Sequence, residues 1–151
     1  MRMFCSIVLL LISISAQAID SLTYEKQIDA VVKLAMDKVG AGDYSGAYAR
    51  LEKFSAEAAQ FPDAWAKQLQ QLQEFSQEAG KTVDCKFIKK NYLSGFLKEY
   101  VYLQRFDAQV LVWRLVFYKS NKDWKLLRVN VSDDLRELFD EANMEFSQSS
   151  H

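Results

Sequence analysis

The chain has 151 residues and carries 19 basic and 20 acidic side chains, with the two signs interspersed along its length. That length fits one domain with a sizeable core, and the mixed charge excludes a nucleic-acid groove or a patch for anionic membranes. The single histidine is the last residue, His151, which excludes histidine-based catalytic triads and histidine zinc sites. The sequence therefore predicts no catalytic residues, no metal and no cofactor, and any enzyme activity would depend on Asp, Glu, Tyr or Lys.

Residues 1–18 have the pattern of a signal peptide. Arg2 precedes an apolar run from Ile7 to Ile14, and Ala16 and Ala18 are the small residues of a cleavage site. A membrane anchor is the alternative, but the run is well short of the roughly 20 residues that span a bilayer. We therefore predict cleavage after Ala18, export to the periplasm or the medium, and no membrane span in the mature chain.

Cleavage would leave Cys85 as the only cysteine of the mature chain, so an intramolecular disulfide is excluded. Cys85 alternates with Val83 and Phe87, which places the three on the apolar face of a strand, and a free cysteine there packs as a small hydrophobe. The alternative is a reactive thiol or an intermolecular disulfide.

Three helices are predicted before residue 81. The first follows the cap candidates Asp20 and Ser21 and ends at Gly40, and the second runs from Asp43 to Phe54. The third follows Pro62 and ends at Gly80. Each has apolar residues at helical spacing. The stripes comprise Ile28, Val31, Val32, Ala35, Met36 and Val39, then Tyr44, Ala47, Tyr48, Leu51 and Phe54, then Trp65, Leu69, Leu72, Phe75 and Ala79.

From Thr82 the pattern changes to alternation, which predicts about four antiparallel strands. The first holds Val83 to Phe87 and ends at a polar break over residues 89–91. The second runs from Tyr100 to Phe106, the third begins at Val110, and the fourth begins at Trp124. The alternation predicts a core face made of Leu111, Trp113, Leu115, Phe117, Leu127, Val129 and Val131.

Ser132 is predicted to cap a short helix that ends near Ala142, and residues 143–151 are predicted to be a disordered tail. The predicted fold is thus a single α+β domain over residues 19–142. Three N-terminal helices would pack on a curved antiparallel sheet of about four strands, followed by the short C-terminal helix.

This organisation resembles the nuclear-transport-factor-2-like superfamily, whose cystatin-like fold is a cone, and within it small exported bacterial proteins of unknown function. The residues that carry the resemblance are Gly42-Asp43-Tyr44 with Ala47-Tyr48, Trp65, Phe117-Tyr118-Lys119 and Asp123-Trp124-Lys125. The superfamily includes isomerases and dehydratases that act inside the cone with an Asp base and a Tyr or His partner. No residue of this chain matches that motif, so the resemblance implies the fold and not the activity.

Two functions are consistent with these elements. The first is an exported, non-catalytic binding or interaction protein that forms a homodimer through the outer face of the sheet. That face would comprise Tyr100, Tyr102, Arg114, Tyr118, Leu126 and Arg128. The second is a pocket inside the cone that binds or isomerises a small apolar ligand. Its lining would be Tyr48, Trp65, Trp113 and Phe117. The simpler alternatives are scattered surface aromatics for the first set and ordinary core packing for the second.

Overall fold

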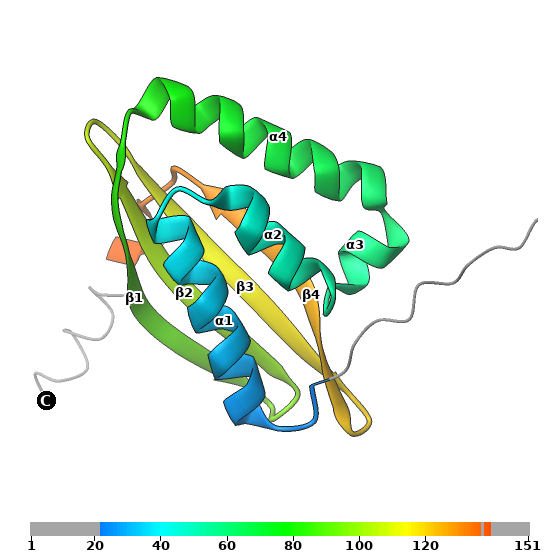
Figure 1. Cartoon of the computed structure of the whole chain (residues 1–151). Helices are drawn as coiled ribbons and strands as arrows, with labels where there is room; N and C mark the ends of the chain where they lie inside the picture. Colours follow the sequence, from blue (N-terminus) through cyan, green and yellow to red (C-terminus); the bar gives the residue numbers. More distant parts are fainter. Residues whose placement is uncertain (1–21, 137, 140–151) are drawn as a thin grey trace, which may run out of the picture.

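Four helices precede a four-stranded antiparallel sheet in the computed structural model, which describes residues 22–136, 138 and 139 (Figure 1). The predicted signal peptide and the predicted tail lie outside these residues. The elements are α1 (Glu25–Gly40), α2 (Tyr44–Glu52), α3 (Ala56–Gln60), α4 (Pro62–Ala79), β1 (Thr82–Leu93), β2 (Leu97–Phe106), β3 (Val110–Ser120) and β4 (Asp123–Ser132).

The helical segment holds one helix more than predicted. The additional helix is α3, and the Oγ of Ser55 caps it by accepting a hydrogen bond from the Ala58 amide at 3.0 Å. Five residues are too few to show a helical period, so the apolar pattern could not reveal it. The predicted helix over residues 132–142 is not confirmed: the Leu138 amide donates to the Leu135 carbonyl at 3.1 Å, but most of the segment lies outside the described residues.

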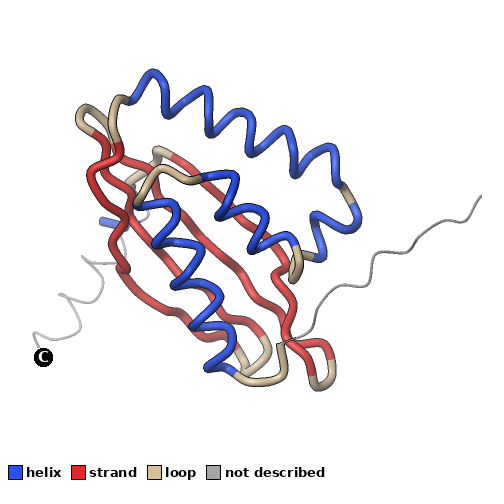
Figure 2. The backbone as a smooth tube through the Cα atoms, viewed as in Figure 1, coloured by secondary structure: helices blue, strands red, loops and turns tan. Residues whose placement is uncertain are grey.

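The sheet has the simple order β1-β2-β3-β4, and the helices lie on one side of it (Figures 1 and 2). We call this the helix side and the opposite surface the outer face. Strand β1 is longer than predicted, because the predicted break over residues 89–91 continues the ladder: Lys90 pairs with Tyr100 and Tyr92 with Lys98. Lys90 lies on the helix side, where its Nζ donates to Asp29 of α1 at 2.7 Å.

Three register shifts interrupt the strand pairing, and two of them change residues that the alternation assigned to the core face. One extra residue, Leu127, lies between Leu126, which pairs with Phe117, and Arg128, which pairs with Val116. The alternation therefore reverses there, so Leu126 is buried in the core and Leu127 is exposed, contrary to the prediction. A second register shift near Thr82 leaves Val83 exposed, while Cys85 packs against the core as expected.

The core lies between the helices and the sheet and is filled by large side chains. Trp113, Leu115 and Phe117 of β3 are fully buried, as are Ile28 of α1 and Leu51 of α2. Burial of each such side chain contributes about 1.5–3 kcal/mol to stability. The predicted core face of the third strand is thus confirmed, while that of the fourth holds for Val129 and Val131 only.

Candidate functional site: a cleft beneath α4 and the exposed β1 edge

Of the four aromatic residues predicted to line a pocket, Tyr48 packs against Trp65 and Trp113, and Phe117 packs against Tyr100. Trp113 and Phe117 are fully buried, and Trp65 and Tyr48 nearly so. The ring centroid of Tyr48 lies 4.9 Å from that of Trp65 and 6.4 Å from that of Trp113. These side chains are buried in the core, so together they do not enclose the predicted internal pocket, and Tyr48 also lines an open cleft.

That cleft lies between α4 and the ends of β3 and β4, and we call it the α4 cleft. Figure 1 shows α4 along the top of the view, with α2 between it and α1. The volume is about 340 Å³, which lies at the small end of the range for small-molecule sites. Apolar walls from α4 and the strands are combined with polar groups at the rim. The lining residues are Tyr48, Gln68, Gln71, Leu72, Phe75, Leu111, Val131, Ser132 and Asp133.

The hydroxyl of Tyr48 is the most unusual group of the α4 cleft. It is buried and has no hydrogen-bond partner among the described residues. Burial first, and then the nearby Glu57 carboxylate, raise the pKa of Tyr48 well above its ordinary value. The hydroxyl therefore stays protonated and can donate a hydrogen bond to an acceptor.

The residues predicted to form an outer-face interface divide between the two sides of the sheet. Tyr100, Tyr102 and Leu126 lie on the helix side, so they cannot line an interface on the outer face. Tyr100 is turned inward because its hydroxyl donates to Asp29 of α1 at 2.5 Å and its ring lies 5.8 Å from that of Phe117. Leu126 is turned inward by the bulge at Leu127.

The other three interface candidates do lie on the outer face. Arg114 donates to Glu99 at 3.0 Å, and Arg128 is exposed beside Asn130 on the same strand. Tyr118 is 40% exposed, and its ring lies 6.4 Å from that of Phe96. Only Tyr118 of the three is aromatic, and the row of Val116 and Arg128 separates it from Arg114, so they form no contiguous aromatic patch.

Sequence reasoning missed a cluster of ions and aromatic rings under α1. Asp29 accepts hydrogen bonds from both Lys90 and Tyr100, and the buried Lys98 forms an ion pair with Glu25. The ammonium of Lys98 also lies 4.6 Å from the Trp124 ring centroid, which is a favourable cation–π distance. The i, i+4 spacing of Glu25 and Asp29 is the available signal, but the sequence pattern places Lys90 in a polar break and Lys98 before the second predicted strand, so it does not pair them with α1.

These ionised groups are held in their charged forms. Burial alone would raise the pKa of Asp29, but hydrogen bonds from Lys90 and Tyr100 and the charges of Lys90 and Lys98 outweigh it, so the pKa lies below its ordinary value. Burial and the hydrogen bond to Asp29 raise the pKa of Tyr100. Neither group titrates near neutral pH, so the cluster fits a structural role better than proton transfer.

Strand β1 forms one open edge of the sheet, and we call it the β1 edge. Its large apolar side chains are roughly half exposed: Val83, Phe87, Ile88, Tyr92 and Leu93. Burial, and then the charges of Asp84 and Asp37, raise the pKa of the Cys85 thiol to about 12, so this cysteine is not a thiolate at neutral pH.

Comparisons with known proteins returned no matching family model, no matching curated protein and no matching solved structure. Within residues 22–136, 138 and 139, no helix combines the length and apolarity needed to cross a bilayer. The same residues contain no group of three or more His, Cys, Asp or Glu side chains that could hold a metal ion. The candidate sites therefore rest on geometry alone.

Proposed function

We propose that the chain is an exported, non-catalytic interaction protein that binds an extended segment of a partner protein along the β1 edge. The observation that carries this proposal is the contrast between the two edges of the sheet. An edge strand offers unpaired backbone groups to any extended chain, and proteins usually cover or shorten such edges. Strand addition at an exposed edge is a recurrent mode of peptide recognition.

The β4 edge is covered by the chain itself. The Trp124 amide donates to the Leu22 carbonyl at 2.8 Å, and the Leu126 amide donates to the Phe54 carbonyl at 2.8 Å. Further along, the Gln68 side chain donates to the Val129 carbonyl at 3.0 Å. The β1 edge spans 12 residues, and no comparable backbone hydrogen bond reaches it from the described part of the chain.

The charges of β1 indicate the chemistry of the partner. The strand carries lysines at positions 86, 89 and 90 and a single acid, Asp84. A second copy of β1 would bring lysine-rich strands together, and like charges on paired strands are destabilising. The proposed partner is therefore an extended segment that combines apolar and acidic side chains, and homodimerisation becomes an alternative outcome of the test.

A synthetic strand tests the proposal. A ten-residue peptide that alternates valine and glutamate is titrated into the ¹⁵N-labelled protein, and a valine and lysine peptide serves as the peptide control. We expect amide shifts within residues 82–93 for the acidic peptide only. Ile88→Glu should raise the dissociation constant about tenfold, the equivalent of ~1.4 kcal/mol.

Leu127→Glu is the matched control variant, because Leu127 is 45% exposed on the opposite edge and Ile88 is 44% exposed. It should leave the dissociation constant within about twofold, as expected for a surface change away from the site. Equal effects of both variants, or equal binding of both peptides, would contradict the proposal. A dimer that forms without peptide and dissociates in Ile88→Glu would instead identify the partner as a second copy.

The setting of this function is also a proposal. The pattern of residues 1–18 supports export, and the helices on one side of an antiparallel sheet support the resemblance to the nuclear-transport-factor-2-like superfamily. Mass spectrometry of the protein isolated from an exported fraction tests the first point. A mass that begins at residue 19 is the expected result, and an intact N-terminus would contradict it.

A second candidate function is the binding of a small ligand in the α4 cleft, and the unpaired hydroxyl of Tyr48 favours it. An unsatisfied buried hydroxyl costs free energy, which a ligand acceptor would recover. The apolar walls and the Tyr48 donor fit an uncharged ligand with an aliphatic body and one carbonyl oxygen. Asp133 at the rim disfavours a carboxylate.

The probe for this second function is 2-nonanone, a neutral ketone with an aliphatic chain. We expect it to raise the thermal midpoint of the wild-type protein and to lose this effect in Tyr48→Phe. Without ketone, Tyr48→Phe should be neutral or stabilising by up to about 1 kcal/mol, because it removes an unpaired hydroxyl. Tyr118→Phe is the control, and loss of protection in both variants would count against the cleft.

A further inference from the structure

Two valines on the outer face are buried although the helices lie on the other side of the sheet. Val101 of β2 is 0% exposed and Val112 of β3 is 2% exposed. Neither belongs to the core that packs between the helices and the sheet. Figures 1 and 2 show α1 to α4 on the helix side only. Something other than these helices must therefore cover the middle of the outer face.

The strand register arranges this part of the outer face in two adjacent rows. One row runs from Ser132 through Val112 and Leu103 to Lys86. The next row runs from Asn130 through Arg114 and Val101 to Lys89. Both rows begin at the end of β4 and finish on β1. Val112, Leu103 and Val101 lie in the middle of the two rows together with Arg114, and each row ends in a lysine on β1.

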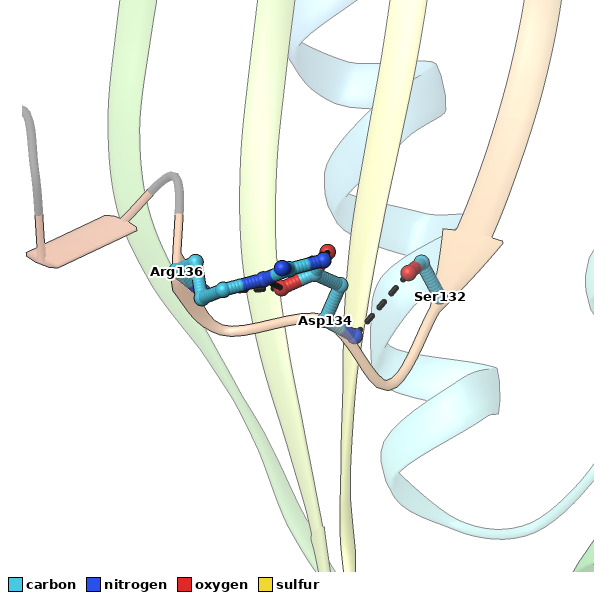
Figure 3. Close-up of polar contacts among 3 residues, drawn as sticks. All are labelled: Ser132, Asp134 and Arg136. Atoms are coloured by element: carbon cyan, nitrogen blue, oxygen red, sulfur yellow. Dashed lines mark hydrogen bonds and ion pairs between the residues drawn. The ribbon is translucent and has the colours of Figure 1, made fainter.

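The chain that follows β4 turns back over the same rows. The Oγ of Ser132 accepts from the Asp134 amide at 3.0 Å, and Arg136 forms an ion pair with Asp134 at 2.6 Å. Figure 3 shows Asp134 and Arg136 in front of the strands, with a helix visible behind the sheet. Asp134 shares a small cavity of about 90 Å³ with Val112, Arg114 and Asn130. The chain thus leaves β4 across the outer face.

The sequence from residue 135 onward is complementary to these rows. Leu135, Leu138, Ala142 and Phe146 recur at helical spacing, and Leu135 and Leu138 are half-buried while Phe139, off this stripe, is 65% exposed. Half of the remaining side chains up to residue 146 are acidic: Glu137, Asp140, Glu141 and Glu145. The outer face carries more basic than acidic side chains, namely Lys86, Lys89, Arg105, Arg114, Lys125 and Arg128 against Asp84 and Glu99.

We propose that residues 135–146 form an amphipathic helix that lies across the outer face and covers Val101 and Val112. Twelve residues of helix span about 18 Å, and four strands about 4.8 Å apart span roughly 14 Å, so this helix reaches from β4 to β1. Its apolar stripe packs on the middle of the two rows, and its acids meet the lysines of β1. The outer face is then occupied within one chain, and an interface between copies on that face would require this helix to leave.

Zero-length cross-linking of the full chain tests this placement. A carbodiimide joins a carboxylate to a lysine only where the two are in contact. We expect cross-links from Glu137, Asp140, Glu141 or Glu145 to Lys86 or Lys89. In an equal mixture of ¹⁴N and ¹⁵N chains, the two peptides of each cross-linked pair should contain the same nitrogen isotope, because both come from one chain. Absence of these cross-links would overturn the proposal. Cross-links between a ¹⁴N peptide and a ¹⁵N peptide would also overturn it, because the helix would then cover a second copy of the chain.

Two neighbouring substitutions add a matched pair of variants. Leu138→Ser removes a half-buried member of the stripe and should lower the cross-link yield about tenfold, whereas Phe139→Ser at the 65% exposed position should leave it within about twofold. The same pair is followed by amide exchange of residues 135–146, which should accelerate about tenfold in Leu138→Ser only. Equal behaviour of the two variants would also overturn the proposal.

Discussion

At the scale of single residues, one glutamine holds together the polar part of the core. The Gln104 side chain is fully buried, and its Oε1 accepts from the Trp113 indole at 2.9 Å. Its Nε2 donates to the Tyr44 hydroxyl at 2.8 Å and to the Thr82 hydroxyl at 3.1 Å. A buried amide whose donors and acceptor are all satisfied can be tolerated in a core, and it specifies which groups meet there.

Gln104→Leu should therefore be strongly destabilising. It leaves the Trp113 indole without its acceptor and removes one of the two partners of Tyr44, and an unsatisfied buried group costs about 1–3 kcal/mol. We expect the free energy of unfolding in urea to fall by about 2–4 kcal/mol on that basis. Gln109→Leu, at an exposed position in the turn before β3, is the control. It should change the free energy of unfolding by less than about 0.5 kcal/mol. Similar losses in both variants would show that the network contributes nothing specific.

At the scale of elements, α1 is joined to the sheet by ions as well as by apolar packing. Ile28, Val32, Ala35 and Val39 are buried on one side of the helix, and Glu25 and Asp29 meet Lys98 and Lys90 near its first turn. This arrangement explains why β1 extends through residues that the alternation pattern assigned to a break. A lysine in a strand is favourable where a helix offers it a carboxylate.

The stability that Asp29 contributes should depend on pH in a defined direction. Because the pKa of Asp29 is lower in the folded protein than its ordinary value of 3.8, its contribution is present above about pH 4 and is lost as the pH falls. We expect Asp29→Asn to lower the free energy of unfolding by about 0.5–1 kcal/mol at pH 7, since the ion pair is half exposed to solvent. The difference from wild type should shrink toward zero near pH 2.

Urea unfolding at the two pH values measures this effect, with Asp37→Asn as the control at an exposed i, i+4 pair with Lys33. A deficit of Asp29→Asn that is as large at low pH as at pH 7 would mean that the carboxylate charge is not the source of the stability.

At the scale of the whole molecule, the β4 edge of the sheet is covered by other segments of the chain, whereas the β1 edge is open among the described residues. Leu22 extends the β4 edge by one bridge to Trp124, and residues 54 and 55 cover the next part of it. The β1 edge carries exposed apolar side chains without such cover from the described residues. A sheet with one covered and one open edge can accept an added strand at the open edge only, and this is the basis of the proposed function.

Removal of residues before Glu25 should open the β4 edge as well. A chain that starts at Glu25 loses Leu22, which is 4% exposed, together with both of its hydrogen bonds to Trp124. We expect a lower thermal midpoint and self-association that rises with concentration in sedimentation velocity, since uncovered edges pair with one another. A chain that starts at residue 19 is the control. Identical sedimentation of the two chains would show that Leu22 does not protect the edge.

The sequence by itself determined where the helices and strands lie. Apolar spacing is a property of neighbouring residues, so it predicted α1, α2, α4 and most of β2, β3 and β4. It could not determine which side of the sheet Leu126 faces, because the bulge at Leu127 depends on pairing with β3. It also could not place Tyr100, whose orientation follows from Asp29 on a helix that lies 71 positions away.

Only the tertiary structure decided what the predicted site residues do. Tyr48 is packed between Trp65 and Trp113, whereas the ring of Phe117 packs on Tyr100, and Tyr48 also lines the α4 cleft. The β1 edge became visible only with the strand order, which places β1 at the border of the sheet. Burial and edge position are relations between distant segments, and a local pattern contains no information about them.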